Sequence, residues 1–484
     1  MKNVVPWALL IFVIVDGQDG PAEEMIASAG LGAGPIPGQI VVDPDYPAWF
    51  KYHDGGPHYM SGPGDPEGFL YRGQRNPDGT RDGDQMELIQ KLAKTDANCI
   101  YLMAVRSHGG DGGPTENPFI DSDPASPLNE NILEQWESWF AAMEANGITI
   151  FFFFYDDDTC MNHPLWNTGD DLGDAEQRFI DTIVDRFKHH KRLIWCVKEE
   201  YAEGMSRARA ERIAERIRLA DDRQHPVAVH QWHGTSFDFD GSAHFNQFAM
   251  QYNVDTAEEL HAGAVAAWNN VQGRVNVNLS EFQNAGTGRE LRKKIWAIAM
   301  AGAYSMIFRM DIATTPLEDL RACGRLVRFM ESTRFNEMSP SDELARGDTD
   351  YVLAAPGTAY IVYADSGDRL GLMGLEGTYS SKWFDPLCGN WLDGGIATLQ
   401  TGEWTFPKPA SIGDEAVLYI EACTHAFPAG SARDLVDFGV FQRCFTGAGG
   451  EVESACACAD ADRDGDVDIH DFRQTFVPAP AEGS

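Results

Sequence analysis

The sequence predicts an α/β fold: a (β/α)₈ TIM barrel, then a small all-β sandwich and a short EF-hand-type segment. Three observations predict this order. Between residues 40 and 336, apolar runs alternate with amphipathic helical stretches, which is typical of a parallel sheet. Between residues 337 and 422, short strand-like runs are separated by Gly, Pro and Asp turns. Residues 424–478 are rich in Asp, Gly and Cys and contain a calcium-loop pattern.

The amino terminus has the pattern of a secretory signal. Met1 and Lys2 are followed by an apolar stretch from Val4 to Val15, which is short for a membrane-spanning helix. We therefore expect residues 1–20 to be a signal peptide and the protein to be secreted or held at the cell surface. The cleavage site stays open, because the small residues Ala27-Ser28-Ala29 lie rather far downstream. No other stretch of the sequence predicts a transmembrane segment.

The amino-acid composition indicates which classes of molecule the protein can bind. The chain has 38 Lys and Arg residues against 74 Asp and Glu residues, a formal charge of -36. A surface this acidic repels nucleic acid and anionic membranes, so a neutral substrate fits better. Nine cysteines are present, and four of them crowd near the end of the chain, which predicts local disulfides in an oxidising compartment. Those four are Cys423, Cys444, Cys456 and Cys458.

Eight apolar runs are the expected barrel strands. They are His58 to Ser61, Asn98 to Val105, Ile148 to Tyr155, Leu193 to Val197, Pro226 to His230, Phe248 to Tyr252, Val275 to Leu279 and Tyr304 to Phe308. Eight strands favour a closed barrel, with an open doubly wound sheet as the alternative. The segment Gly234 to Asn246, between the fifth and sixth runs, is too rich in Gly and Asp for a full helix, so one crossover is expected to be degenerate.

In a parallel barrel the working residues follow the strand ends, because the loops there form one concave face. The polar residues at these ends are acids, aromatics and amides, which suit the hydroxyls and C–H faces of a sugar. We therefore expect a carbohydrate substrate. The predicted substrate-binding residues are Asp65, Glu67, Arg106, His108, Asp156, Asp157, Trp232, His233, Gln251 and Arg309.

Two of the strand ends carry candidate catalytic carboxylates. Cleavage of a glycosidic bond needs two such groups, one to deliver a proton and one to attack carbon or activate water. The fourth run leads into Glu199 and Glu200, and the seventh leads into Glu281. Each glutamate alone could be a helix-capping residue. Their joint placement at strands four and seven favours catalysis.

This arrangement resembles the clan of retaining glycoside hydrolases with an acid/base glutamate after strand four and a nucleophile glutamate after strand seven. The apiosidase-like and endoglucanase-like barrels are the most similar members, because an apolar strand containing Ile194-Trp195 leads to the acid. The resemblance implies retention, Glu281 as nucleophile, and no cofactor for catalysis. It implies Glu200 as the acid/base, or Glu199, which stands where these enzymes have Asn. Trp383 to Pro386 with Gly389 is similar to a motif of the collagen-binding-type β-sandwich that often follows such barrels.

The last motif predicts a structural Ca²⁺ site. Aspartates surround Gly465 in the pattern Asp-x-Asp-x-Asp-Gly followed by a closing acid. The expected ligands are Asp460, Asp462, Asp464, Asp466 and Asp471. The loop resembles a dockerin repeat, in which Asp takes the last position, and this resemblance implies a cohesin-like or cell-surface partner.

Two other functions remain open from the sequence. The first is a carbohydrate-binding or scaffold protein that kept the barrel and lost activity, since Lys198-Glu199 departs from the related pattern. The second is a metal-dependent hydrolase that uses the aspartates from Asp156 to Asp158. The sugar, the linkage and endo or exo action are not indicated by the sequence.

Overall fold

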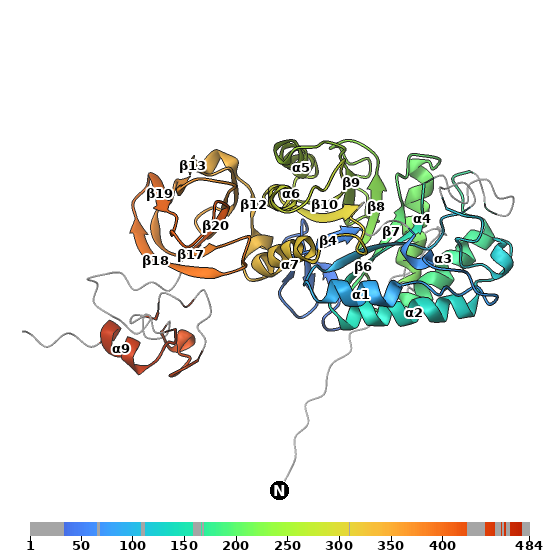
Figure 1. The fold of residues 1–484 in the computed structure, drawn as a ribbon, viewed down its shortest axis with the longest axis horizontal. Helices are drawn as coiled ribbons and strands as arrows, with labels where there is room; N and C mark the ends of the chain where they lie inside the picture. The colour runs from blue at the N-terminus through green and yellow to red at the C-terminus, as the bar shows by residue number, and fades with distance from the viewer. Residues whose placement is uncertain are drawn as a thin grey trace, which may run out of the picture.

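A computed structural model describes residues 33–64, 68–107, 112–157, 166, 169–308, 310–423, 441–450, 456, 459–460 and 465–476 (Figure 1). The expected signal peptide, residues 1–20, lies outside the described residues. The largest unit is an eight-stranded parallel sheet with helices around it. Its strands are β4 Ser61–Gly64, β5 Cys99–Met103, β6 Thr149–Tyr155, β7 Leu193–Lys198, β8 Val227–Gln231, β9 Gln247–Gln251, β10 Asn276–Glu281 and β11 Ala303–Phe308.

The sheet closes on itself. Its strands run in the order β4-β11-β10-β9-β8-β7-β6-β5, and every pair between neighbours is parallel. At the seam between β4 and β5, Asn98 N donates to Ser61 O at 3.1 Å, and Ser61 N donates to Asn98 Oδ1 at 3.0 Å. These bonds join β4 to β5, the two strands at the ends of that order. The arrangement is therefore the predicted (β/α)₈-type barrel rather than an open sheet.

Every barrel strand except β8 is followed by a long helix. The helices are α1 Gln85–Ala93, α2 Glu130–Ala145, α3 Asp174–Phe187, α4 Arg207–Ala220, α5 Ala257–Val271, α6 Arg289–Met300 and α7 Leu317–Glu331. Side chains at Asn129, Ser206 and Thr256 cap the first turns of α2, α4 and α5. The link between β8 and β9 contains no helix, which confirms the degenerate crossover expected there. The short 3₁₀ turns are η1 Phe69–Tyr71, η2 Ile120–Ser122, η3 Phe335–Glu337 and η4 Asp342–Leu344.

The first barrel strand lies further along the chain than the sequence predicted. The prediction was His58 to Ser61, whereas the strand is Ser61–Gly64. Residues Pro57–His58 form β3, which pairs in a small antiparallel sheet with β1 Ile40–Val42 and β2 Phe50–Tyr52. His58, Tyr59, Met60 and Ser61 are all buried, so no exposed polar turn marks the boundary between the two sheets. Tyr304 at the start of β11 donates to His58 O at 2.7 Å, so this small sheet lies at the amino-terminal end of the barrel.

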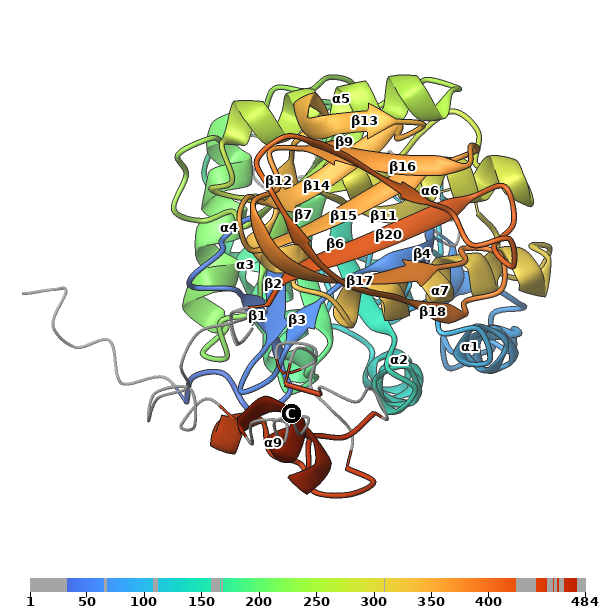
Figure 2. The ribbon, with the colours of Figure 1, turned by 90° about the vertical axis from the view of Figure 1, so that its left-hand side faces the viewer.

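Residues beyond the barrel form two antiparallel sheets. One has the order β12-β14-β15-β20-β17-β18 and the other β13-β16-β19. Their bounds are β12 Ser339–Pro340, β13 Ala345–Gly347, β14 Tyr351–Ala355, β15 Ala359–Ala364, β16 Arg369–Met373, β17 Gly377–Phe384, β18 Trp391–Leu399, β19 Glu403–Pro407 and β20 Ala416–Ala422. Side chains from both sheets share a hydrophobic core, including Val362 of β15 and Leu370 of β16. Figure 2 shows both sheets in front of the helices α5 and α6.

The larger sheet packs directly on the barrel helices. Trp296 of α6 stacks on Tyr363 of β15, with ring centroids 5.6 Å apart and planes within 9°. Arg292 of the same helix donates to Glu415 Oε2 at 2.6 Å. Phe329 of α7 stacks on Trp391 at 5.1 Å. Burial of these large rings holds the sheets against the side of the barrel that α6 and α7 cover.

Some cysteines form a disulfide and others are free thiols. Cys444 and Cys456 form a disulfide, which confirms a local bridge near the end of the chain. Cys99 and Cys196 are free thiols buried in barrel strands, and burial raises the pKa of each well above its usual value.

The final helix, α9, spans Ile469–Phe476. Within the described residues, every helix is too short or too polar to cross a membrane.

Candidate active site

The predicted catalytic carboxylates come together at the carboxyl-terminal rim of the barrel. Glu199 and Glu200 directly follow β7, and Glu281 is the last residue of β10. In the ladder between β9 and β10, Glu281 is paired with Gln251, and the register shifts between Leu279 and Glu281. Because of this irregularity, Glu281 lies beside the end of β9.

A tight turn fixes Glu200. Its φ of +38° places the backbone in the left-handed region, which is uncommon for a residue with a side chain. The backbone N–H of Glu200 donates to His230 Nδ1 at 3.0 Å, and the carbonyl accepts from Glu203 N at 2.8 Å. The side chain of Gln251, the last residue of β9, lies near enough to the Glu200 carboxyl group to lower its pKa, against the larger effects that raise it. A contact from β8 and a bond within the turn therefore hold a residue that follows β7.

The Glu200 carboxyl group titrates near neutral pH. Burial, followed by the negative charges of Glu203 and Glu281, raises the pKa of Glu200 to about 7. A like charge nearby penalises the ionised form, and a lower dielectric adds to that penalty. A carboxylic acid in this state can donate a proton at neutral pH, while a second carboxylate acts in its charged form.

Glu281 is almost fully buried, with 2 % of its surface exposed, and it faces a histidine. His230 Nε2 lies 4.0 Å from Glu281 Oε2. Because His230 Nδ1 accepts the Glu200 N–H, the neutral ring carries its proton on Nε2, on the side of Glu281. Burial and the nearby positive charge of Lys198 lower the pKa of His230 to about 3. The ring is therefore neutral at the pH where Glu200 titrates.

Lys198 ties the turn after β7 together. Its buried ammonium group donates to the carbonyls of Glu199 at 3.0 Å and Glu203 at 3.4 Å. Burial lowers the pKa of Lys198, and the negative charges of Glu199, then Asp157 and Asp156, oppose that shift. Lys198 therefore neutralises an otherwise acidic corner of the rim. Glu199 is buried beside this ammonium group. Of the two adjacent glutamates, Glu200 is the one whose pKa is raised by the charge of Glu281.

Predicted substrate-binding residues line the same rim. Asp156 is buried and Asp157 is half-buried, and both follow β6. Arg106 follows β5 and donates to Glu116 Oε2 at 2.6 Å, so its charge is partly used in a loop contact. Predicted residues Asp65, Glu67, His108 and Arg309 lie outside the described residues.

An exposed aromatic surface follows β8 and β9. Trp232 is 52 % exposed, and its ring centroid lies 6.0 Å from that of His233. The ring of His233 is nearly parallel to that of Tyr252, with centroids 6.3 Å apart and planes within 20°. Flat rings at the mouth of a barrel can pack against the C–H faces of a sugar.

Three residues of the site were missed by sequence reasoning. His230 closes an apolar predicted strand, which was the available signal, because polar residues at barrel strand ends face the rim. Glu203 and Tyr252 offered weaker signals. Glu203 approaches Glu200 through a turn that no sequence pattern marked, and Tyr252 was assigned to a strand that ends one residue earlier.

The carboxyl-terminal loop brings acids together as well. The carboxylate oxygens of Asp466, Asp468 and Asp471 lie within 4.8 Å of one another, and all three residues are buried. Gly465 has a φ of +96°, and its N–H donates to Asp460 Oδ2 at 3.1 Å. These residues can hold a hard cation such as Ca²⁺. The other two predicted ligands, Asp462 and Asp464, lie outside the described residues.

The fold can be compared with known proteins. No protein-family model and no curated protein matches the sequence. A glycoside hydrolase family 5 structure from Bacteroides vulgatus ATCC 8482 aligns with a TM-score of 0.59 and 12% identity, covering 80% of this chain and 94% of that one. The chain therefore shares the fold of this structure. A second structure, named only as a glycoside hydrolase, aligns with a TM-score of 0.59 and 13% identity, covering 80% and 98% of the two chains.

Proposed function

We propose that this chain is a secreted glycoside hydrolase that cleaves a glycosidic bond of a poly- or oligosaccharide with retention. Glu200 is the acid/base and Glu281 is the nucleophile. The observation that carries the proposal is the placement of both carboxyl groups on one rim, with the pKa of Glu200 raised to about 7 by burial and by the charges of Glu203 and Glu281. The fold shared with glycoside hydrolase structures supports it.

The first step uses the two groups in opposite protonation states. The Glu281 carboxylate attacks the anomeric carbon while Glu200 gives its proton to the glycosidic oxygen, so the C–O bond to the leaving group breaks. The sugar becomes an ester of Glu281. In the second step Glu200, now ionised, takes a proton from water, and the water oxygen attacks the anomeric carbon. Glu281 leaves as a carboxylate, and the configuration is retained.

Other residues position the reacting groups. His230 holds Glu200 through its backbone N–H, and Gln251 lies beside the Glu200 carboxyl group. The neutral Nε2–H of His230 faces Glu281 and favours its charged form. Trp232 and the stacked pair His233 and Tyr252 offer a surface for sugar rings. The acids Asp156 and Asp157 offer acceptors for sugar hydroxyls.

We also propose that the carboxyl-terminal loop binds one structural Ca²⁺ through Asp460, Asp462, Asp464, Asp466 and Asp471. The close approach of Asp466, Asp468 and Asp471 supports this, because buried carboxylates repel one another until a cation lies among them. A cohesin-like or cell-surface partner would bind this segment. Catalysis needs no cofactor in this proposal.

A survey of activity tests the proposal. The wild-type chain and Glu281→Gln are assayed on aryl glycosides and on plant and algal polysaccharides. We expect the wild type to hydrolyse at least one substrate and the variant to lose that activity. Binding of a polysaccharide without hydrolysis would favour a carbohydrate-binding scaffold instead. Loss of activity in a chelator that a transition metal restores, and Ca²⁺ does not, would favour a metal-dependent hydrolase.

A further inference from the structure

A second cluster of reactive side chains lies at the opposite end of the barrel from the catalytic rim. It consists of Glu137 on α2 and of His189 and His190, which follow α3. His190 precedes β7, whereas Glu200 follows that strand, so the strand separates the two places. One ligand atom from each of the three residues lies within 4.8 Å of the others.

Both imidazole rings converge on one carboxylate. His189 Nε2 lies 2.9 Å from Glu137 Oε1, and His190 Nε2 lies 3.2 Å from the same oxygen. The two ring centroids are 4.2 Å apart. Two nitrogen atoms and one oxygen atom, from α2 and from the segment after α3, therefore surround one small volume.

His190 is held in the orientation of a metal ligand. Its side chain is 3 % exposed, and its Nδ1 lies 3.0 Å from Glu144 Oε2. The Glu144 oxygen also accepts from Lys191 N at 2.9 Å, which marks it as an acceptor. Nδ1 of the neutral ring therefore carries the proton, and Nε2 presents a lone pair. A carboxylate behind a histidine in this way fixes the tautomer that binds metals.

No hydrogen-bond donor among the described residues faces the lone pair of His190 Nε2. Within the described part of the chain, neither this nitrogen nor Glu137 Oε2 has a hydrogen-bond partner, and both atoms are buried. Glu137 Oε1, at 3.2 Å from Nε2, is itself an acceptor. Two acceptors at that distance need a cation or a proton between them, because buried polar atoms left unpaired cost free energy.

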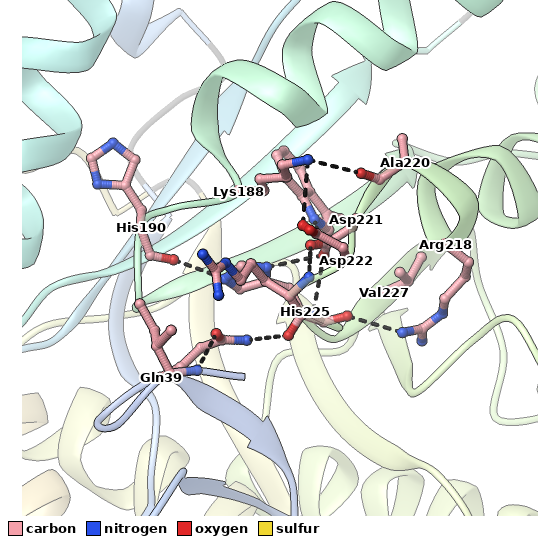
Figure 3. A network of polar contacts seen from close by, with 12 residues as sticks. Gln39, Lys188, His190, Arg218, Ala220, Asp221, Asp222, His225 and Val227 are labelled. Carbon is pink, nitrogen blue, oxygen red and sulfur yellow. Dashed lines mark hydrogen bonds and ion pairs between the residues drawn. The ribbon is translucent and has the colours of Figure 1, made fainter. Parts of the chain in front are cut away.

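The backbone of His190 is fixed independently of its ring. The His190 carbonyl accepts from His225 Nε2 at 2.8 Å, and His225 Nδ1 lies 2.9 Å from Asp221 Oδ2. Figure 3 shows the His190 carbonyl directed into this network and the ring directed away from it. The ligand ring is therefore placed by contacts that do not depend on a bound ion.

We propose that Glu137, His189 and His190 bind one divalent transition-metal ion, Zn²⁺ by the nature of its donors. Two imidazoles and a carboxylate suit Zn²⁺ better than Ca²⁺ or Mg²⁺, which prefer oxygen ligands. Water or the second oxygen of Glu137 completes the four-coordinate shell. The ion joins α2 to the segment between α3 and β7, so its role is structural, away from the rim.

Arg186 is the competing cation. Its Nε lies 3.9 Å from Glu137 Oε2, and its Nη1 lies 3.7 Å from Glu130 Oε2. Both separations exceed a hydrogen bond, and the Arg186 side chain is 32 % exposed, so the ion pairs are weak. Arg186 can turn toward solvent and leave Glu137 to the metal.

Calorimetry on the full chain tests the proposal. Zn²⁺ is titrated at pH 7.5 with excess Ca²⁺ present, so that the aspartate loop is saturated. We expect one Zn²⁺ per chain for the wild type and binding weakened roughly tenfold or more for His189→Ala and Glu144→Gln. His189 is 56 % exposed, so its removal leaves the fold intact. The control His53→Ala removes another histidine beside an acid, Asp54 at 3.6 Å, and should bind like the wild type.

A spectroscopic measurement keeps the test independent of stability. Co²⁺ replaces Zn²⁺ at nitrogen and oxygen sites, and its visible absorption reports a low-coordinate environment. We expect this absorption in the wild type and His53→Ala, and its loss in His189→Ala. Absence of a one-to-one Zn²⁺ site in the wild type, or unchanged binding in His189→Ala, would overturn the proposal. In either case the three residues form a polar cluster that holds no metal ion.

Discussion

His230 Nε2 lies 4.0 Å from Glu281 Oε2, and the other nitrogen of the same ring accepts the Glu200 N–H at 3.0 Å. One buried ring on β8 therefore contacts residues that follow β7 and end β10. The Glu200 N–H fixes the tautomer of His230, so the ring presents Nε2–H to Glu281. The proposed acid/base and nucleophile are coupled through this histidine.

The first prediction concerns His230 itself. His230→Ala removes both contacts, and we expect kcat to fall roughly a hundredfold, because positioned polar groups at a reacting centre have effects of this size. His230→Asn can still accept the Glu200 N–H through Oδ1 but has no atom at the position of Nε2. It should keep the wild-type melting temperature while kcat stays low. Near-normal kcat in both variants would show that His230 is only a packing residue.

The second prediction concerns pH. With its pKa at about 7, Glu200 must be protonated to act as the acid, so kcat/KM should decline as pH rises through about 7. Glu203→Gln removes a negative charge that raises this pKa. The pKa of Glu200 should then be lower, and the basic limb of the profile should move to lower pH.

Glu258→Gln is the control for that shift, since it removes an exposed acid on α5. Its profile should overlay that of the wild type. A basic limb that stays in place in Glu203→Gln, measured from kcat/KM between pH 5 and pH 9, would contradict the assignment of Glu200 as the acid.

The third prediction concerns stability. Arg209 and Glu176 form an ion pair between α4 and α3, with side chains 1 % and 2 % exposed. Arg209→Met leaves a buried carboxylate unpaired and should cost about 3–5 kcal/mol of unfolding free energy. Arg212→Met on the same helix breaks a pair with Asp171 that is exposed on both sides, and should cost at most about 1 kcal/mol. Equal losses in urea unfolding of the two variants would count against this account.

Sequence periodicity was enough to predict the barrel, because parallel strands buried on both faces leave long apolar runs. The run Thr149–Tyr155, with four consecutive Phe residues, needed no further information. The first strand was placed too early, at His58, because the apolar pair Tyr59 and Met60 lies between two strands and belongs to neither. Strands such as Trp391–Leu399 have mostly exposed or half-buried side chains and carry little apolar signal, so they were missed.

The candidate site was predicted as far as strand ends allow. The sequence placed Glu199, Glu200 and Glu281 on one rim. It did not show whether Glu199 or Glu200 is the acid/base, because their burial and neighbours depend on the turn after β7. The left-handed backbone of Glu200 and the hydrogen bonds from Lys198 to two carbonyls decide that turn. Such contacts join residues through space and leave no periodic pattern in the chain.

The fourth prediction concerns the carboxyl-terminal loop. Residues 424–484 should gain resistance to protease in the full chain when Ca²⁺ is added, since a bound ion neutralises the repelling aspartates. Asp464→Ala removes a predicted ligand and should weaken Ca²⁺ binding about tenfold or more. Arg463→Ala alters the neighbouring position, which supplies no ligand, and should bind normally. Calorimetry showing no Ca²⁺ binding, or no difference between the variants, would rule out the site.

The central claim is that Glu281 forms a covalent bond to the sugar. A 2-deoxy-2-fluoro glycoside of the preferred sugar, with a good leaving group, slows the second step and lets the ester accumulate. Peptide mapping by mass spectrometry should then find one glycosyl unit on the peptide that contains Glu281, and none in Glu281→Gln. A label on Glu199 or Glu200, or turnover without any labelled peptide and with inverted configuration, would contradict the account.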